Sequence, residues 1–128
     1  GFMNWMVFQE NFTSKQFVVF LGRLNRQIKQ KIFLILDNHK VHHSKHVQAY
    51  VNKHKDKIRL FFLPPYCPEL NPEELVNQDV KANANNFKVM KSIEDLATNV
   101  RFYLTKIQFN EYKIRSYFNK KEVQYASI

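Results

Sequence analysis

The chain has 128 residues, enough for one domain with a hydrophobic core, and 45% of them are hydrophobic, as in globular proteins. Its net charge of +9 suggests a polyanionic partner, either nucleic acid or an anionic membrane surface. Only two glycines are present, which excludes glycine-rich phosphate loops, and no apolar run approaches the roughly 20 residues that span a bilayer. A single cysteine rules out an internal disulfide and makes a cytoplasmic protein the expectation.

Strands and helices are expected to alternate in the first half of the chain. The predicted elements are a strand at 3–9, a helix at about 14–28, a strand at Ile32–Leu36, a helix from Ser44 and a strand at Ile58–Leu63. The Ile32–Leu36 run is apolar without alternation, which is typical of a strand buried on both faces in a parallel sheet. This order predicts an α/β fold with a parallel or mixed sheet.

Prolines mark the start of the second half. All four lie in the segment 63–72, which predicts a rigid, non-helical loop. Asn71 followed by Pro72 predicts the start of a helix that runs to about Asn83. Further on, the pattern predicts a polar loop at 83–91, a long amphipathic helix from Ser92 and a short helix at Glu111–Phe118.

Two acidic residues stand where chemistry is often found. Asp37 directly follows a predicted buried strand, and ligands of α/β sheets bind beyond the carboxyl ends of the strands. A simple turn at Asp37 is equally compatible with this position. Glu74 lies three residues after Asn71, where a glutamate can reach back to cap the helix, and the residues alone favour that capping role. Glu69 and Glu73 are nearby alternatives for an acidic role.

Histidines and lysines give weaker indications. The five histidines lie at positions 39, 42, 43, 46 and 54, but no Cys, Asp or Glu completes a closed zinc set with them, so most are expected to be solvated. Lys81, Lys88 and Lys91 could contact phosphate or be ordinary surface charges, and the net charge favours contact.

The stretches ILDNHKVHHSKHV and LFFLPPYCPELNPEELVNQDVK resemble the mariner-like bacterial insertion-sequence transposases, which belong to the DDE superfamily of RNase H-like nucleases. The resemblance extends from the first predicted strand to the RSYF segment at 115–118. It implies a truncated RNase H-like α/β fold that lacks the first two strands of the family. It also implies one partial catalytic domain over 1–128, with a strand and helix core at about 1–82 and C-terminal helices at about 92–128.

That family cuts and rejoins DNA with two divalent metal ions held by three carboxylates. Carried over residue by residue, the second acid is Asp37 and the third is Glu74, with Glu73 the less favoured alternative. Hard carboxylate oxygens suit Mg²⁺ or Mn²⁺, and two such ions can activate the attacking oxygen and stabilise the leaving one. Asn38 and His42 match positions that flank the site in the family, and these two residues and Asn71 are the candidates for a supporting role.

The resemblance also implies the partners. They are DNA, as transposon ends and target, with no membrane and no small-molecule substrate, and the implied location is the bacterial cytoplasm, associated with the nucleoid. The family's first catalytic Asp lies upstream of the matched region, so we expect the chain to be inactive alone. The alternative is a non-catalytic transposase remnant that binds nucleic acid or oligomerises. Without the first two strands the edge of Ile32–Leu36 is open, and we expect either residues 3–9 or a second copy of the chain to pair there.

Overall fold

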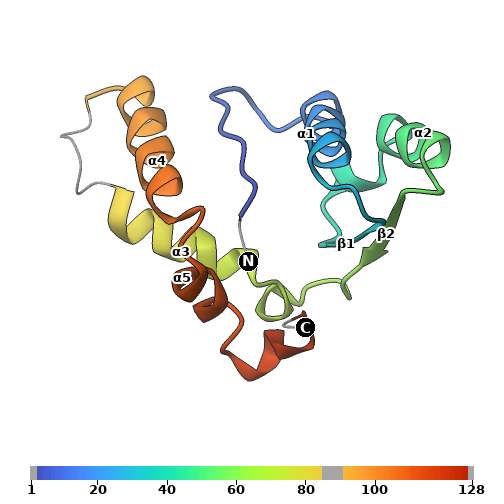
Figure 1. The fold of residues 1–128 in the computed structure, drawn as a ribbon. Coiled ribbons are helices and arrows are strands. Elements are labelled where there is room, and N and C mark those ends of the chain that lie inside the picture. Colours follow the sequence, from blue (N-terminus) through green and yellow to red (C-terminus); the bar gives the residue numbers. More distant parts are fainter. Residues whose placement is uncertain (1–2, 85–90, 127–128) are drawn as a thin grey trace. The chain divides into compact units, whose positions relative to one another are not determined.

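The computed structural model describes residues 3–84 and 91–126, and the chain forms two compact units. We call residues 11–67 the sheet unit, and residues 1–10 together with 68–128 the helical unit. Figure 1 labels the helices and strands in chain order. The sheet unit contains α1 (Ser14–Gln27), β1 (Ile32–Leu36), the 3-10 helix η1 (Lys40–His43), α2 (Lys45–Lys53) and β2 (Ile58–Phe62). The helical unit contains the 3-10 helix η2 (Pro68–Leu70), α3 (Glu73–Asn83), α4 (Ile93–Ile107), α5 (Glu111–Ser116) and the 3-10 helix η4 (Lys121–Ala126).

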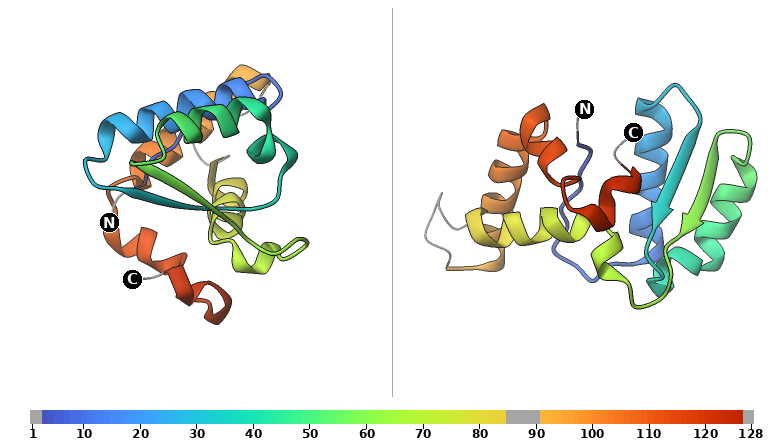
Figure 2. Two further views of the ribbon diagram at one scale, coloured as in Figure 1. Left: turned by 90° about the vertical axis from the view of Figure 1, so that its right-hand side faces the viewer. Right: turned by 90° about the horizontal axis from the view of Figure 1, so that it is seen from below.

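The sheet unit is built on two parallel strands. β1 and β2 pair in register from Ile32 opposite Ile58 to Leu36 opposite Phe62. Both α1 and α2 lie over the same face of this sheet (Figure 2, left). Their buried side chains pack against the inward-facing positions of the strands. The predicted parallel α/β arrangement is therefore confirmed for these two strands.

The prediction that Ile32–Leu36 is buried on both faces is wrong. Side chains alternate along a strand, and Phe33 and Ile35 remain 65% and 44% exposed because the helices of this unit cover only the opposite face. On β2, Phe61 shares the open face and its ring lies 6.1 Å from that of Phe33. Apolar runs of five residues thus do not distinguish a strand covered on one face from a strand covered on both.

Local signals set the starts of both helices in the sheet unit. Thr13 caps α1 through a reciprocal pair of hydrogen bonds with Gln16, which forms a capping box. Ser44 caps α2 by accepting a hydrogen bond from the Val47 amide, as the sequence predicts.

The helical unit has its core along α4. Tyr103, Leu104, Ile107 and Tyr117 form a buried cluster, and side chains from α3 pack against it. At the start of α4 the amphipathic prediction is only partly right, because Ile93 is 59% exposed and contributes nothing to this cluster. Of the polar loop predicted at 83–91, residues 85–90 lie outside the described part of the chain.

The strand predicted at residues 3–9 does not form. This segment is extended, but its backbone bonds go to the helical part of its own unit: the Met3 amide donates to the Gln108 carbonyl at 2.9 Å. Met3, Trp5 and Val7 alternate toward the core at α4, and Trp5 Nε1 donates to Gln108 Oε1 at 3.1 Å. Alternation of apolar residues therefore reflects packing against a helix, without a partner strand. Pairing of 3–9 with β1 is accordingly wrong, since within the described residues β1 pairs with β2 alone.

The proline-rich segment is not wholly irregular, because η2 forms one short turn of 3-10 helix within it. Asn71 makes the predicted capping hydrogen bond, because its Oδ1 accepts from the Glu73 amide at 3.1 Å, although it does not occupy the N-cap position itself. Pro72 already has helical backbone angles and stands at the N-cap of α3, one residue later than expected. The helix ends at Asn83, as predicted.

Candidate active site

Asp37 lies at the carboxyl end of β1, the predicted place for a functional residue in a parallel sheet. Its Oδ1 atom accepts a hydrogen bond from the His39 amide at 2.9 Å and lies 3.0 Å from Nδ1 of His42. Its side chain is 49% exposed, and Oδ2 makes no hydrogen bond or ion pair within the described residues. One carboxylate oxygen therefore holds the side chain in place while the other is available to a ligand.

His42 is the group that orients Asp37. Its side chain is only 12% exposed, and its ring packs against the Phe17 ring at a centroid distance of 4.6 Å. Nδ1 lies 3.1 Å from the backbone oxygen of Asp37 as well as 3.0 Å from Oδ1. Both of these oxygens can only accept, so Nδ1 carries the hydrogen that binds them. His42 therefore holds the Asp37 carboxylate in one orientation, and its supporting role in a metal site stays a prediction.

Asn38 ties the ends of the two strands together. Its Nδ2 donates a short hydrogen bond to the carbonyl of Leu63, and the Leu63 amide donates to the Leu36 carbonyl at 2.7 Å. Since the Leu63 carbonyl only accepts, Asn38 presents Oδ1 to Nε2 of His43, which lies 2.9 Å away and must carry a hydrogen. Asn38 therefore fixes the loop that follows β1.

Glu74 lies in the first turn of α3. Glu74 is partly buried, whereas the neighbouring Glu73 is exposed. The capping role that the sequence favours for Glu74 is not present. The backbone amide of Asn71, which a capping glutamate would bind, donates instead to the Pro68 carbonyl at 3.0 Å. Within the described residues the Glu74 carboxylate makes no hydrogen bond or ion pair, so capping does not account for it.

A carboxylate that the sequence analysis missed holds α3 in place. Asp79 Oδ2 accepts hydrogen bonds from the hydroxyls of Tyr103 and Tyr117, both at 2.6 Å. Its Oδ1 lies 2.8 Å from Nδ2 of Asn83 and 3.2 Å from Nζ of Lys113. Asp79 therefore joins the helix that carries Glu74 to α4 and to α5. The signal was present in the spacing, because Asp79 shares the apolar side of α3 with Val76 and Val80.

The titration of this group follows from its surroundings. Burial on its own raises the pKa of the Asp79 carboxyl, but the hydrogen bonds from Tyr103, Tyr117 and Lys113 outweigh burial, so the pKa is lowered. Burial, and then the Asp79 carboxylate, raise the pKa of both tyrosine hydroxyls. Asp79 is thus ionised and both tyrosines are neutral at pH 7.

The three lysines considered for phosphate contact do not all lie in the described part of the chain. Lys81 and Lys91 are exposed, whereas Lys88 lies outside the described residues. Across residues 3–84 and 91–126, no three His, Cys, Asp or Glu side chains are gathered so that they could hold a metal ion. In the same residues, no helix is long and apolar enough to cross a membrane.

Comparison with known proteins gives the family. Residues 1–97 match the family model of the DDE superfamily endonucleases. A protein of Sinorhizobium fredii, named "Uncharacterized protein y4pE/y4sA", is 38% identical over 61 residues. These residues make up 48% of this chain and 45% of that relative, so the chain matches less than half of the relative's length. The family match covers well over half of the chain, and the chain belongs to the DDE superfamily endonucleases.

Proposed function

We propose that this chain is part of the catalytic domain of a DDE transposase of the mariner-like bacterial insertion-sequence type, with an RNase H-like fold. It takes part in metal-dependent cleavage and strand transfer of DNA. Residues 1–128 form one part of this domain, with a strand and helix core at about 1–82 and C-terminal helices at about 92–128. A cytoplasmic, nucleoid-associated location follows from the same proposal.

The observation that carries the proposal is the state of Asp37. It stands at the carboxyl end of a parallel strand with Oδ1 held by His42 and Oδ2 available. DDE-type nuclease domains generally use divalent metal ions, and a half-exposed carboxylate oxygen is the ligand type that Mg²⁺ or Mn²⁺ prefers. Glu74 adds a second carboxylate that no cap or ion pair uses within the described residues. Both side chains thus fit as metal ligands by their chemistry.

Each residue of the proposed site has a separate task. Asp37 and Glu74 would hold the ions, which supply the electrostatic stabilisation of phosphodiester chemistry. His42 keeps the Asp37 carboxylate in one orientation by donating through Nδ1. Asn38 and Asn71 shape the two loops, the first through Leu63 and the second through the α3 amide. Asp37 and Glu74 are two of the three carboxylates that such a site uses, so we expect residues 1–128 alone to lack strand-transfer activity.

Titration with Mn²⁺ tests the metal site, because this paramagnetic ion broadens the NMR signals of nearby nuclei. We expect broadening at the amides next to Asp37 and Glu74 that is lost in Asp37→Asn and Glu74→Gln. The matched controls are Asp56→Asn and Glu69→Gln, which remove exposed acids from the same two units. Equal loss in the controls, or undiminished broadening in Asp37→Asn, would refute the assignment.

DNA contact is tested by the salt dependence of duplex binding. Phosphate contacts release counterions, so affinity for a duplex should fall steeply with salt concentration. Removing Lys81, Lys88 or Lys91 should each reduce the slope of log affinity against log salt by about 1 if that lysine contacts a phosphate. Binding that is absent or insensitive to salt would contradict a direct role in DNA binding.

The second candidate function is a non-catalytic remnant that oligomerises, and the open side of β1 favours it. Among the described residues β1 pairs with β2 alone, and Phe33 and Ile35 are exposed beside that free edge. Such edges pair readily with a second copy of a chain. Light scattering should then report a dimer that Ile35→Lys converts to a monomer. A wild-type monomer across the micromolar range would eliminate this candidate.

A further inference from the structure

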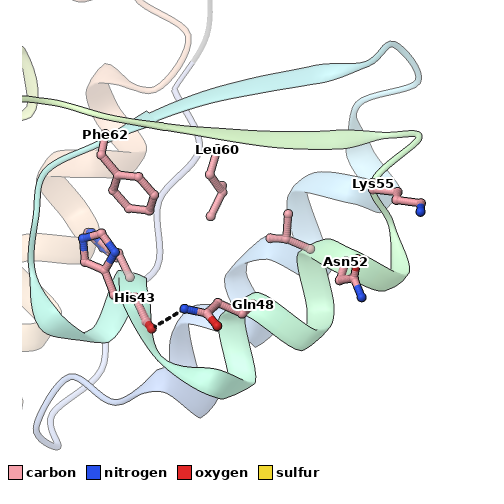
Figure 3. Close-up of a pocket in the computed structure, with 8 residues that line it drawn as sticks. His43, Gln48, Asn52, Lys55, Leu60 and Phe62 are labelled. Carbon is pink, nitrogen blue, oxygen red and sulfur yellow. Dashed lines mark hydrogen bonds between the residues drawn. The ribbon is translucent and has the colours of Figure 1, made fainter.

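A cavity of about 310 Å³ opens in the sheet unit between α2 and β2, beside η1 (Figure 3). Its size lies at the lower end of the roughly 300–1,000 Å³ typical of small-molecule sites. Such a volume accepts one flat ring system with a small substituent.

One end of the cavity is an aromatic wall. The rings of His43 and Phe62 are stacked, with their centroids 4.2 Å apart and their planes inclined by 22°. Phe62 and Leu60 project from β2 toward α2 in Figure 3, and Val51 adds further apolar lining from α2. A flat aromatic ligand gains stacking energy against such a wall, whereas an aliphatic ligand gains only apolar burial.

His43 is not free to move away from this wall. Its Nε2 donates to Oδ1 of Asn38 at 2.9 Å, and its backbone oxygen accepts a hydrogen bond from Nε2 of Gln48 at 2.9 Å. Asn38 in turn is held by the Leu63 carbonyl and directly follows Asp37 in the chain. The aromatic wall is therefore preorganised, and it is connected to the loop that presents Asp37.

The rim offers hydrogen-bonding groups that are not used within the protein. In the part of the chain that the structure describes, the Asn52 amide and the Lys55 ammonium make no hydrogen bond or ion pair. Amide side chains match the paired donor and acceptor edges of nucleobases, and a lysine matches a phosphate. None of the described residues that line the cavity is acidic, so nothing in its lining repels an anion.

We propose that this cavity binds the base of an unpaired nucleotide in a DNA strand, an inference that rests on the function proposed above. The base stacks on the wall of His43 and Phe62, while the Asn52 amide bonds to its edge. Lys55 neutralises the adjoining phosphate. The site therefore holds single-stranded DNA next to the loop of Asp37, and the DNA that the domain acts on has at least one base out of its duplex.

The first test uses a short single-stranded oligonucleotide that contains one 2-aminopurine, whose fluorescence falls when it stacks. Phe62→Leu should weaken its binding to the full chain by about fivefold or more, because stacking on an aromatic side chain is lost. Phe61→Leu is the matched control, because Phe61 is the neighbour of Phe62 in β2 and its side chain points to the opposite face of the sheet, away from the cavity. The two residues are almost equally exposed, Phe61 at 42% and Phe62 at 40%. Equal effects of the two substitutions, or no effect of Phe62→Leu, would overturn the proposal.

The second test uses the unmodified chain, so it does not depend on how a variant folds. Deoxyadenosine monophosphate should shift the methyl NMR signals of Val51 and Leu60, and deoxyribose 5-phosphate, which lacks a base, should not. Equal shifts from both compounds would show a phosphate site and overturn the proposal. An apolar peptide that shifts these signals more strongly than the nucleotide would overturn it as well.

These results can be separated from the fate of the proposed function. Base-dependent shifts in a chain that shows no Mn²⁺ broadening at Asp37 would leave the cavity assignment standing without the metal site. Mn²⁺ broadening together with absent base-dependent shifts would remove the cavity assignment alone.

Discussion

Replacing Asp79 by asparagine should destabilise the helical unit by about 2 kcal/mol. The carboxylate accepts hydrogen bonds from Tyr103 and Tyr117, both at 2.6 Å, and its side chain is only 13% exposed. Hydrogen bonds to a charged group contribute about 1.5–3 kcal/mol and neutral ones about 0.5–1.5 kcal/mol, so loss of the charge costs about 1 kcal/mol for each tyrosine. The ion pair with Lys113, whose side chain is 37% exposed, adds at most about 0.5 kcal/mol.

Urea unfolding followed by tryptophan fluorescence measures the stability of the helical unit, to which Asp79 belongs. Trp5 is the only tryptophan of the chain, it belongs to the helical unit, and it packs against the α4 cluster. The matched control Asp56→Asn removes an exposed carboxylate from the sheet unit and should leave the Trp5 transition unchanged. A loss below about 0.5 kcal/mol in Asp79→Asn, within the range of ordinary surface substitutions, would refute the reasoning.

A double-mutant cycle separates the tyrosine bond from general damage. Tyr103→Phe should destabilise the wild-type chain by more than it destabilises the Asp79→Asn chain, because the charged acceptor is already absent from the second background. Equal losses in the two backgrounds would show that the hydroxyl and the carboxylate act independently.

The stability that the Asp79 carboxylate contributes should depend on pH. The folded pKa of Asp79 lies below the usual value of 3.8, so its contribution is fully present above that value and is lost as the pH falls through the folded pKa. Wild-type stability, read from Trp5, should therefore decline below about pH 4, and Asp79→Asn should show a smaller decline. The same acid dependence in both proteins would assign the effect to other groups.

Three further predictions concern other parts of the molecule. Asn38→Ala removes two hydrogen bonds and should lower the stability of the sheet unit by about 1–2 kcal/mol, seen as roughly tenfold faster hydrogen exchange of the Leu63 amide. Tyr66 is fully exposed with φ 58°, so Tyr66→Asn should raise the urea midpoint by an amount equivalent to about 1 kcal/mol, and a lower midpoint would contradict this. Burial and Asp79 raise the pKa of Tyr103 and Tyr117, so the stability that these two hydroxyls contribute should be fully present below pH 10 and lost as the pH rises further. The stability read from Trp5 should therefore fall above pH 10, and a profile that stays flat from pH 7 to pH 12 would contradict this.

Sequence patterns predicted the local structure of this chain better than its burial. Ser44 and Asn71 mark helix starts because capping depends on groups within a few residues. Burial depends on what lies across the strand, so Ile32–Leu36 was expected to be covered on both faces, and Phe33 is not. The run at 3–9 has strand-like alternation, yet its partner is the Gln108 turn about a hundred residues away, which no local pattern encodes.

In the candidate site too, contacts between residues close in the sequence could be predicted, and contacts between distant residues could not. Asp37 could be selected from its place after an apolar run, and His42 clamps it across only five positions. Asp79 was missed because its meaning comes from Tyr103 and Tyr117, two distant tyrosines. A lone acid on the apolar side of a predicted helix is the signal that would have found it, since such an acid must be paired.

Asp37 and Glu74 differ in how firmly they are held, and this difference predicts unequal roles if both bind metal. Asp37 is already oriented by His42 and by the His39 amide, so little conformational entropy remains for it to lose on binding an ion. Glu74 makes no such bond within the described residues and has one more rotatable bond, so fixing it costs about 1–2 kcal/mol. Asp37→Asn should therefore weaken Mn²⁺ affinity by about tenfold more than Glu74→Gln, measured by titration of the two variants side by side. A larger loss in Glu74→Gln would show that the orientation of Asp37 contributes little to metal binding.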